Sequence, residues 1–159
     1  MGTRSAIGYK RRGGKIRAKY SHFDGYVAGA GKTLQEHYQE ARKIAQMVEL
    51  GDQKCMSPEI FPMPGSGHSF ETPEEGVTIF YGRDRGESNT DAVEFDTVQE
   101  FVEHYTDSGC EYFYLHTAAG WIVHRLEVGN DANGYPIFDT LEEQVQIEVA
   151  RLKAEGYDI

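Results

Sequence analysis

His22 and Asp24 are the residues whose types and spacing most directly suggest chemistry. An imidazole and a carboxylate two positions apart could act as base and partner in a small hydrolase, or could ligate a metal. His22 also continues the apolar face of the segment before it, where Ile16, Ala18 and Tyr20 alternate with polar residues. The alternative is a core histidine that is hydrogen-bonded to Asp24, and the spacing leaves both interpretations open.

A glycine-rich segment, residues 25–33, follows directly and offers a second kind of chemistry, anion binding. Its end, Gly31-Lys32-Thr33, matches the right half of the nucleotide-binding pattern G-x-x-x-x-G-K-[ST], but Tyr26 stands where that pattern needs its first glycine. We therefore expect no nucleoside triphosphatase. A helix that starts near Thr33 would still direct free N–H groups, beside the charge of Lys32, toward an anion. The alternative is that the glycines only form a turn and Thr33 only caps the helix.

The anion-site hypothesis assigns ligand contacts to the basic strand, the nearby aromatic residues and the glycine-rich segment, namely Arg17, Lys19, His22, Phe23, Asp24, Tyr26, Gly29, Gly31, Lys32 and Thr33. Within this set, Tyr26 and Phe23 could stack on a base, although core and turn packing would explain the same rings. The two cysteines, Cys55 and Cys110, make neither a disulfide framework nor a zinc set. The sequence therefore predicts no metal site and no cofactor.

Charge is distributed unevenly along the chain. The sequence carries 16 lysines and arginines against 26 acidic residues, a formal net charge of −10, which argues against a general nucleic-acid binder. The first 43 residues nevertheless hold ten basic and three acidic residues, whereas the rest of the chain holds six and 23. This split favours an anion site in the N-terminal part. The carboxylates between residues 74 and 107 could instead mimic DNA on a basic host surface, or could simply form solvated faces.

Hydrophobic periodicity indicates the elements that must position these residues. Alternation with period two predicts a hairpin with one basic face, followed by further short strands, over residues 3–9, 16–22, 77–81, 92–95, 111–117 and 121–128. Stripes with the helical period predict three helices, which begin near Thr33, near Asp96 or Thr97, and at Thr140, and which end at Gly51, Gly109 and Gly156. Thr33 and Thr140 each precede a glutamate three positions later, as in a capping box.

The order of these elements predicts an α+β fold, a mostly antiparallel sheet built from hairpins with three helices packed on one face. We expect a single domain over residues 1–159, in which residues 52–76, with four of the five prolines, form a long loop. No apolar run approaches the length of a membrane span, and the N-terminus lacks the apolar core of a signal peptide. A soluble cytoplasmic protein with two free thiols and no membrane partner is expected.

Several motifs together resemble a family of small, mostly uncharacterised bacteriophage proteins. The chain opens with Met1-Gly2-Thr3-Arg4-Ser5 and continues with Ser21-His22-Phe23-Asp24-Gly25-Tyr26, then Gly31-Lys32-Thr33-Leu34 and Glu36-His37-Tyr38. The family similarly opens with M-G-T-R-S and carries an H-W-D-G-Y motif before a glycine loop and a helix. The resemblance covers about the first 50 residues. Phe23 replaces the usual Trp, which keeps an aromatic ring but loses the indole donor.

The resemblance implies a phage accessory protein that works in the host cytoplasm. By analogy with unrelated small phage proteins that sequester nucleotide-derived signals, counter-defence is one expectation. The leading hypothesis is a non-enzymatic protein that binds a compact anionic ligand, a nucleotide or nucleotide-derived signal, at residues 25–33. The alternatives are an acidic interaction protein that blocks a host factor, and a small hydrolase that uses His22 and Asp24. The basic and acidic parts also permit homo-oligomers.

Overall fold

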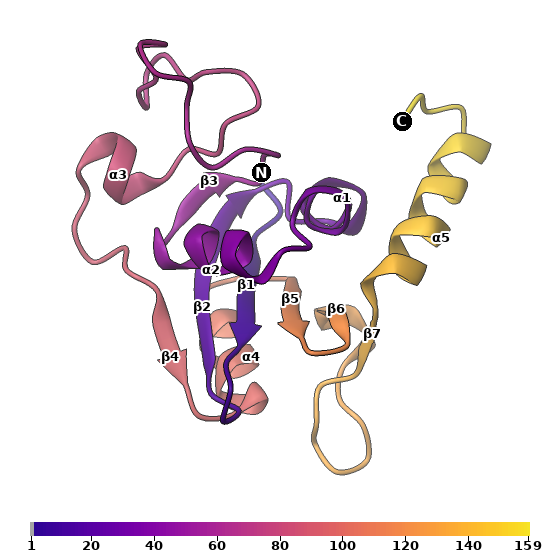
Figure 1. The fold of residues 1–159 in the computed structure, drawn as a ribbon. Coiled ribbons are helices and arrows are strands. Elements are labelled where there is room, and N and C mark those ends of the chain that lie inside the picture. Colours follow the sequence, from indigo (N-terminus) through magenta and orange to yellow (C-terminus); the bar gives the residue numbers. More distant parts are fainter. Residues whose placement is uncertain (1) are drawn as a thin grey trace.

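The structure is a computed structural model that describes residues 2–159, and its central feature is one mixed β-sheet (Figure 1). Among the described residues the sheet has seven strands, which are β1 (Ser5–Lys10), β2 (Ile16–Phe23), β3 (Gln53–Cys55), β4 (Val93–Phe95), β5 (Tyr112–Thr117), β6 (Gly120–Arg125) and β7 (Phe138–Thr140). The strand order is β3-β2-β1-β5-β6-β7, and β4 pairs with β2.

Five α-helices occur in the same described range, which are α1 (Lys32–His37), α2 (Ala41–Glu49), α3 (Tyr81–Arg85), α4 (Val98–Asp107) and α5 (Leu141–Ala154). Two short turns add to them, the π-helical turn η1 (Val27–Gly31) and the 3-10 turn η2 (Leu126–Val128). The predicted α+β class is confirmed, but the prediction of three helices is wrong. None of the helices within residues 2–159 has the length and apolar character that crossing a membrane requires.

Two hairpins form the centre of the sheet and meet through β1 and β5, which run parallel. Antiparallel pairing joins β1 to β2, β2 to β4, β5 to β6, and β6 to β7, whereas β1–β5 and β2–β3 are parallel. A parallel neighbour requires a long crossover connection, and the chain between β2 and β5 supplies it. The sheet is therefore mostly, but not entirely, antiparallel.

Helices cover both faces of the sheet, so the prediction of helices on one face is wrong. In β2 the side chains of Ile16 and Ala18 point to a core that includes Phe101 of α4, while the alternate residues face α2. A second core, on the face of β1 that carries Ile7, is built with residues of α1, α2 and α5 such as Leu34. Figure 1 shows α1 and α2 in front of the central strands and α4 behind them.

The predicted helix from Thr33 to Gly51 is interrupted and begins earlier than expected. The chain enters η1 at Val27 and continues into α1, which places Thr33 inside the helix rather than at its cap. The helix ends at Tyr38, whose φ of −126° and ψ of 72° are not helical. There the Tyr38 hydroxyl donates to the Ser57 carbonyl over 2.6 Å, and the indole Nε1 of Trp121 donates to the Tyr38 carbonyl over 2.7 Å. The Trp121 indole satisfies the Tyr38 carbonyl in place of a helical N–H, and both bonds hold the chain where α1 and α2 are separated.

The other predicted boundaries agree more closely with the structure. Thr97 caps α4, because its hydroxyl accepts a hydrogen bond from the Glu100 N–H at 3.1 Å. The last helix follows Thr140 as predicted, although the Thr140 side chain makes no capping hydrogen bond. The predicted strand over residues 77–81 is reduced to isolated bridges at Val77 and Phe80, after which α3 begins.

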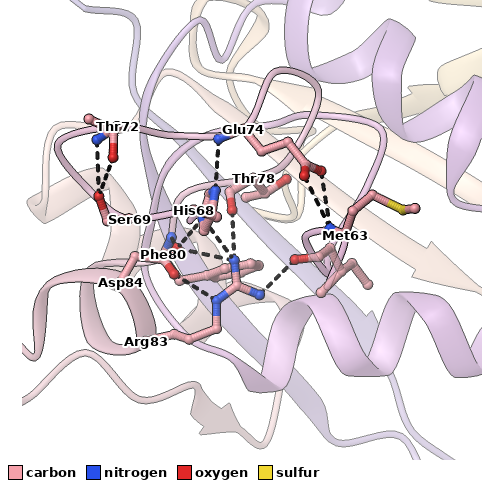
Figure 2. Close-up of polar contacts among 10 residues, drawn as sticks. Met63, His68, Ser69, Thr72, Glu74, Thr78, Phe80, Arg83 and Asp84 are labelled. Carbon is pink, nitrogen blue, oxygen red and sulfur yellow. Dashed lines mark hydrogen bonds and ion pairs between the residues drawn. The ribbon is translucent and has the colours of Figure 1, made fainter. Parts of the chain in front are cut away.

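A cluster of polar side chains that hydrogen-bond to one another and to the backbone holds the proline-rich loop between β3 and α3 in place (Figure 2). The guanidinium of Arg83 donates to the carbonyls of Ile60 (2.6 Å) and Thr78 (3.1 Å) and pairs with Asp84 at 2.9 Å. The His68 ring accepts the Glu74 N–H at Nδ1 (3.0 Å), and its Nε2 lies 3.3 Å from the Asp84 carboxylate. Both ring nitrogens are thus engaged, so this cluster orders the long loop and leaves no free base for catalysis.

Candidate functional site

The two basic residues predicted on β2 are engaged by α2. Arg17 donates to the Glu49 carboxylate through Nη2 (2.6 Å) and Nε (2.9 Å), and this ion pair lowers the pKa of Glu49. Lys19 is fully buried, and its Nζ donates to the Met47 carbonyl at 2.6 Å and lies 4.5 Å from the centre of the Phe80 ring. Burial lowers the pKa of Lys19 well below its usual value. The predicted basic face is therefore packed against α2, with Lys19 buried and Arg17 paired at the edge.

Lys32 and Thr33 lie inside α1 and not at the start of the helical segment, where the anion site was predicted. Lys32 lies in the first turn of α1 and pairs with Glu36, one helical turn later, at 3.2 Å. Thr33 follows it inside the helix. Because the helical segment starts at Val27, the N–H groups at its start lie beside Tyr26, several residues before Lys32.

His22 and Asp24 do not interact in the way that either interpretation requires. The His22 Nδ1 is 2.7 Å from the Tyr20 hydroxyl, and the ring packs edge-on against Phe23. Asp24 is exposed with a φ of +55°, and it accepts a weak hydrogen bond from the Cys55 thiol at 3.6 Å. Among the described residues no hydrogen bond joins His22 to Asp24. The geometry therefore supports neither the hydrolase pair nor the buried His–Asp pair.

The glycines of this segment allow close packing of the helix start. A side chain at Gly29 would place its Cβ 2.5 Å from the Asp24 carbonyl oxygen. At Gly31 the Cβ would lie 3.2 Å from Leu141 and from the Tyr114 ring. The Tyr114 hydroxyl also donates to the Gly25 carbonyl at 2.6 Å. This packing favours the structural interpretation of the glycines.

One predicted residue, Tyr26, does line a hollow at the surface, and we call this feature the arginine hollow. It has a volume of about 390 Å³, within the range of small-molecule sites. Its walls come from the helix start, from β5 and β6 with the turn that follows, and from α5: Tyr26, Val27, Ala28, Tyr112, Arg125, Glu127, Glu148, Arg151 and Leu152. The cations of this site are thus Arg125 and Arg151, not Arg17, Lys19 or Lys32.

Arg125 and Arg151 differ in how far their hydrogen-bonding capacity is used. Arg151 donates to Glu148 at 2.9 Å and to Glu155 at 2.7 Å, which are full charge-assisted hydrogen bonds. Arg125 makes only longer contacts, 3.3 Å to Asp139 and 3.6 Å to Glu127. Its Nε is buried and has no hydrogen-bond partner among the described residues. Because the buried Nε is out of reach of a ligand, the Nη groups of Arg125 are the donors that a ligand in the hollow could use.

Sequence reasoning missed Arg125 because it lies far along the chain from the glycine-rich segment. The sequence does carry one signal that could have found it. Arg125 is a charged residue at the end of a strand in which the alternate residues Trp121 and Val123 are buried. Its partner in the hollow, Tyr112, starts the neighbouring strand β5 and is half-buried. Only the pairing of β5 with β6 brings the two together, as Tyr112 and Arg125 are register partners.

The charge split seen in the sequence is partly compensated within the molecule. Arg11 at the tip of the first hairpin lies 3.2 Å from Glu94, and Lys15 lies 3.4 Å from Asp96. These ion pairs join the basic N-terminal part to the acidic stretch of residues 74–107, the stretch considered above as a DNA mimic. The acidic array is therefore partly neutralised, which weakens the case for a DNA mimic.

Across residues 2–159, no three His, Cys, Asp or Glu side chains are grouped so that they could hold a metal ion. Burial and the neighbouring Asp24 carboxylate raise the pKa of the Cys55 thiol to about 11, which makes it a poor nucleophile. Comparison of the chain with models of protein families, with curated proteins and with solved structures finds no match.

Proposed function

We propose that this protein binds a compact anionic ligand, a nucleotide or nucleotide-derived molecule, in the arginine hollow. The observation that carries the proposal is Arg125, which lines the hollow and whose two Nη groups make only long contacts to carboxylates, 3.3 Å to Asp139 and 3.6 Å to Glu127. A guanidinium in this state can bind a phosphate oxygen with two of its N–H groups.

The surroundings of Arg125 suit a nucleotide in size and chemistry. The N–H groups at the start of η1 lie in the same wall, at Val27 and Ala28, and favour a negative charge there. The rings of Tyr26, which is 42% exposed, and Tyr112 line the hollow as well and could stack on a base. Phosphate would contact Arg125 and the helix start, and the base would contact a tyrosine.

Two carboxylates restrict the number of phosphates. Glu127 and Glu148 lie in the walls together with the two arginines, so the four charges balance. A second or third phosphate group would approach these carboxylates and be repelled. The arrangement therefore favours a monophosphate or a phosphodiester over a triphosphate.

Calorimetric titration of the protein with AMP, cyclic AMP and ATP tests the proposal. We expect the first two to bind more tightly than ATP, and Arg125→Gln to weaken binding roughly tenfold or more, because a charge-assisted hydrogen bond is lost. Tyr26→Ala should weaken binding without affecting folding, since Tyr26 is exposed. Lys32→Gln is the matched control and should bind as the wild type does. Binding that depends on Lys32 and not on Arg125, or no binding of any phosphate compound, would refute the proposal.

Sequestration is the biological role that fits this activity best. The resemblance of the N-terminal motifs to phage proteins favours a protein that holds a nucleotide signal in the host cytoplasm without converting it. Incubation of the protein with the bound nucleotide, followed by denaturation and chromatography, should return the nucleotide intact. Recovery of a hydrolysed product would identify an enzyme instead.

A further inference from the structure

A second cavity lies on the opposite face of the sheet, between α4 and the end of β6, and we call it the acceptor pocket. Its volume is about 450 Å³. Val102 and Leu126 supply an apolar wall, and the polar side chains around the pocket are those of Glu103, Thr106, Asp107, His124 and Asn130. The lining contains neither Lys nor Arg, as far as residues 2–159 show. It is independent of the arginine hollow.

His124 is a buried residue of the pocket, and one of its ring nitrogens has no hydrogen bond to a described residue. Its side chain is 1% exposed, and its Nδ1 lies 2.8 Å from the Ile137 carbonyl oxygen. A carbonyl only accepts, so Nδ1 must carry the proton, and Nε2 of the neutral ring is left as an acceptor. No described residue forms a hydrogen bond with Nε2, and the ring lines the pocket. Burial also lowers the pKa of His124, which keeps the ring neutral.

The side chains of Glu103, Thr106 and Asp107 are acceptors as well, whereas the Asn130 amide can both donate and accept. Glu103 and Asp107 are four residues apart on α4 and lie on one face of the helix. Neither forms an ion pair with any residue in the described part of the chain. The Thr106 hydroxyl donates to the Val102 carbonyl at 2.7 Å, so its proton is already used and its lone pairs remain. Every one of these groups can therefore accept a hydrogen bond, and two carry negative charge.

From this arrangement we propose that the acceptor pocket binds a small organic cation that carries an ammonium or guanidinium group. Such a group supplies several N–H donors and a positive charge. One donor would bind Nε2 of His124, and the charge would lie between Glu103 and Asp107. The methylene chain of the ligand would contact the apolar side chains of Val102, which is buried, and Leu126, which is exposed.

Calorimetry with agmatine and spermidine tests the proposal, with 1,5-pentanediol as an uncharged ligand of similar length. We expect the two amines to bind, the diol not to bind, and the double variant E103Q/D107N to lose roughly tenfold or more in affinity. Both residues are exposed on α4, so folding should be preserved. Glu100→Gln, an exposed change on the same helix outside the pocket, is the matched control and should bind within about twofold of the wild type.

Nitrogen-15 NMR of the histidine rings supplies a second readout. Agmatine should shift the Nε2 resonance of His124 and leave the other histidines unchanged. Absence of amine binding at millimolar concentration, an equal loss in E100Q, or binding that leaves the His124 resonance in place would each overturn the proposal. Binding of an arginine-containing peptide without binding of agmatine would also overturn it, in favour of a protein partner.

Discussion

His124 and Arg125 are consecutive residues of β6 whose side chains line cavities on opposite faces of the sheet. His124 contributes to the acceptor pocket beside α4, and Arg125 contributes to the arginine hollow beside α5. The alternation of a β-strand produces this arrangement, since neighbouring side chains point to opposite sides. One strand can thus present an acceptor to a cation on one face and a donor to an anion on the other.

Replacing Arg125 by glutamine is expected to raise the pKa of His124. Burial is the main reason why this pKa lies below its ordinary value, and the nearby guanidinium lowers it further. Removing the charge removes a repulsion from the protonated ring. NMR titration of the histidine rings in the wild type and in Arg125→Gln measures the change, with Arg151→Gln as the control. An unchanged or lower pKa in Arg125→Gln would contradict this expectation.

Trp121→Phe is expected to destabilise the fold through the loss of one hydrogen bond. The indole donates to the Tyr38 carbonyl, which has left the helical pattern and lies beside a fully buried side chain. Leaving that carbonyl without a donor should lower the free energy of unfolding by about 1–3 kcal/mol. Urea unfolding gives the free energy of unfolding. Circular dichroism follows it, since Trp121 is the only tryptophan and the variant therefore lacks tryptophan fluorescence. A variant as stable as the wild type would show that the bond contributes little.

Lys19→Met is expected to flatten the dependence of stability on pH. The pKa of folded Lys19 lies well below 10.5, so between these values the unfolded chain binds a proton that the folded protein does not. Stability therefore rises with pH over this interval, by up to about 1.4 kcal/mol per pH unit. Above about pH 8.5 the thiols of Cys55 and Cys110 act in the opposite direction, because burial raises their pKa values to about 11 and about 12.

The measurement is therefore the difference between the wild type and Lys19→Met from about pH 7 to about pH 8.5, before the thiols ionise in the unfolded chain. Urea unfolding at several pH values within this window gives the two slopes. We expect the wild type to have the more positive slope. Parallel curves would mean that Lys19 stays protonated inside the protein, with its charge compensated by the Met47 carbonyl and the Phe80 ring.

Arg83→Met is expected to make the proline-rich loop between β3 and α3 more mobile without unfolding the sheet. The guanidinium binds the carbonyls of Ile60 and Thr78 at two points of that segment (Figure 2). Its loss should cost about 1.5–3 kcal/mol locally, since these are hydrogen bonds to a charged group. Hydrogen exchange should accelerate across residues 57–80 and remain slow in β1 and β2. Arg11→Met, which removes an exposed ion pair, is the control and should change neither region.

Much of the local structure could be predicted from the sequence, whereas most of the candidate site could not. The alternation of Ile16, Ala18 and Tyr20 located β2, and Thr97 marked the start of α4, because both signals act between near neighbours in the chain. Of the ten residues predicted to bind a ligand, only Tyr26 lines the arginine hollow. Lys19 looked like a surface cation because period-two alternation shows which residues share a face, but not what covers that face.

The sequence by itself determined the α+β class and the approximate positions of the main strands, since propensity, capping and periodicity are local properties. The tertiary structure alone decided that β1 pairs with β5 in parallel, that helices cover both faces, and that Arg125 rather than Lys32 lies at the hollow beside Tyr26. Strand pairing and burial depend on free energies summed over contacts between distant segments. The unpaired donors of Arg125 and the free Nε2 of His124 exist only after those contacts have formed.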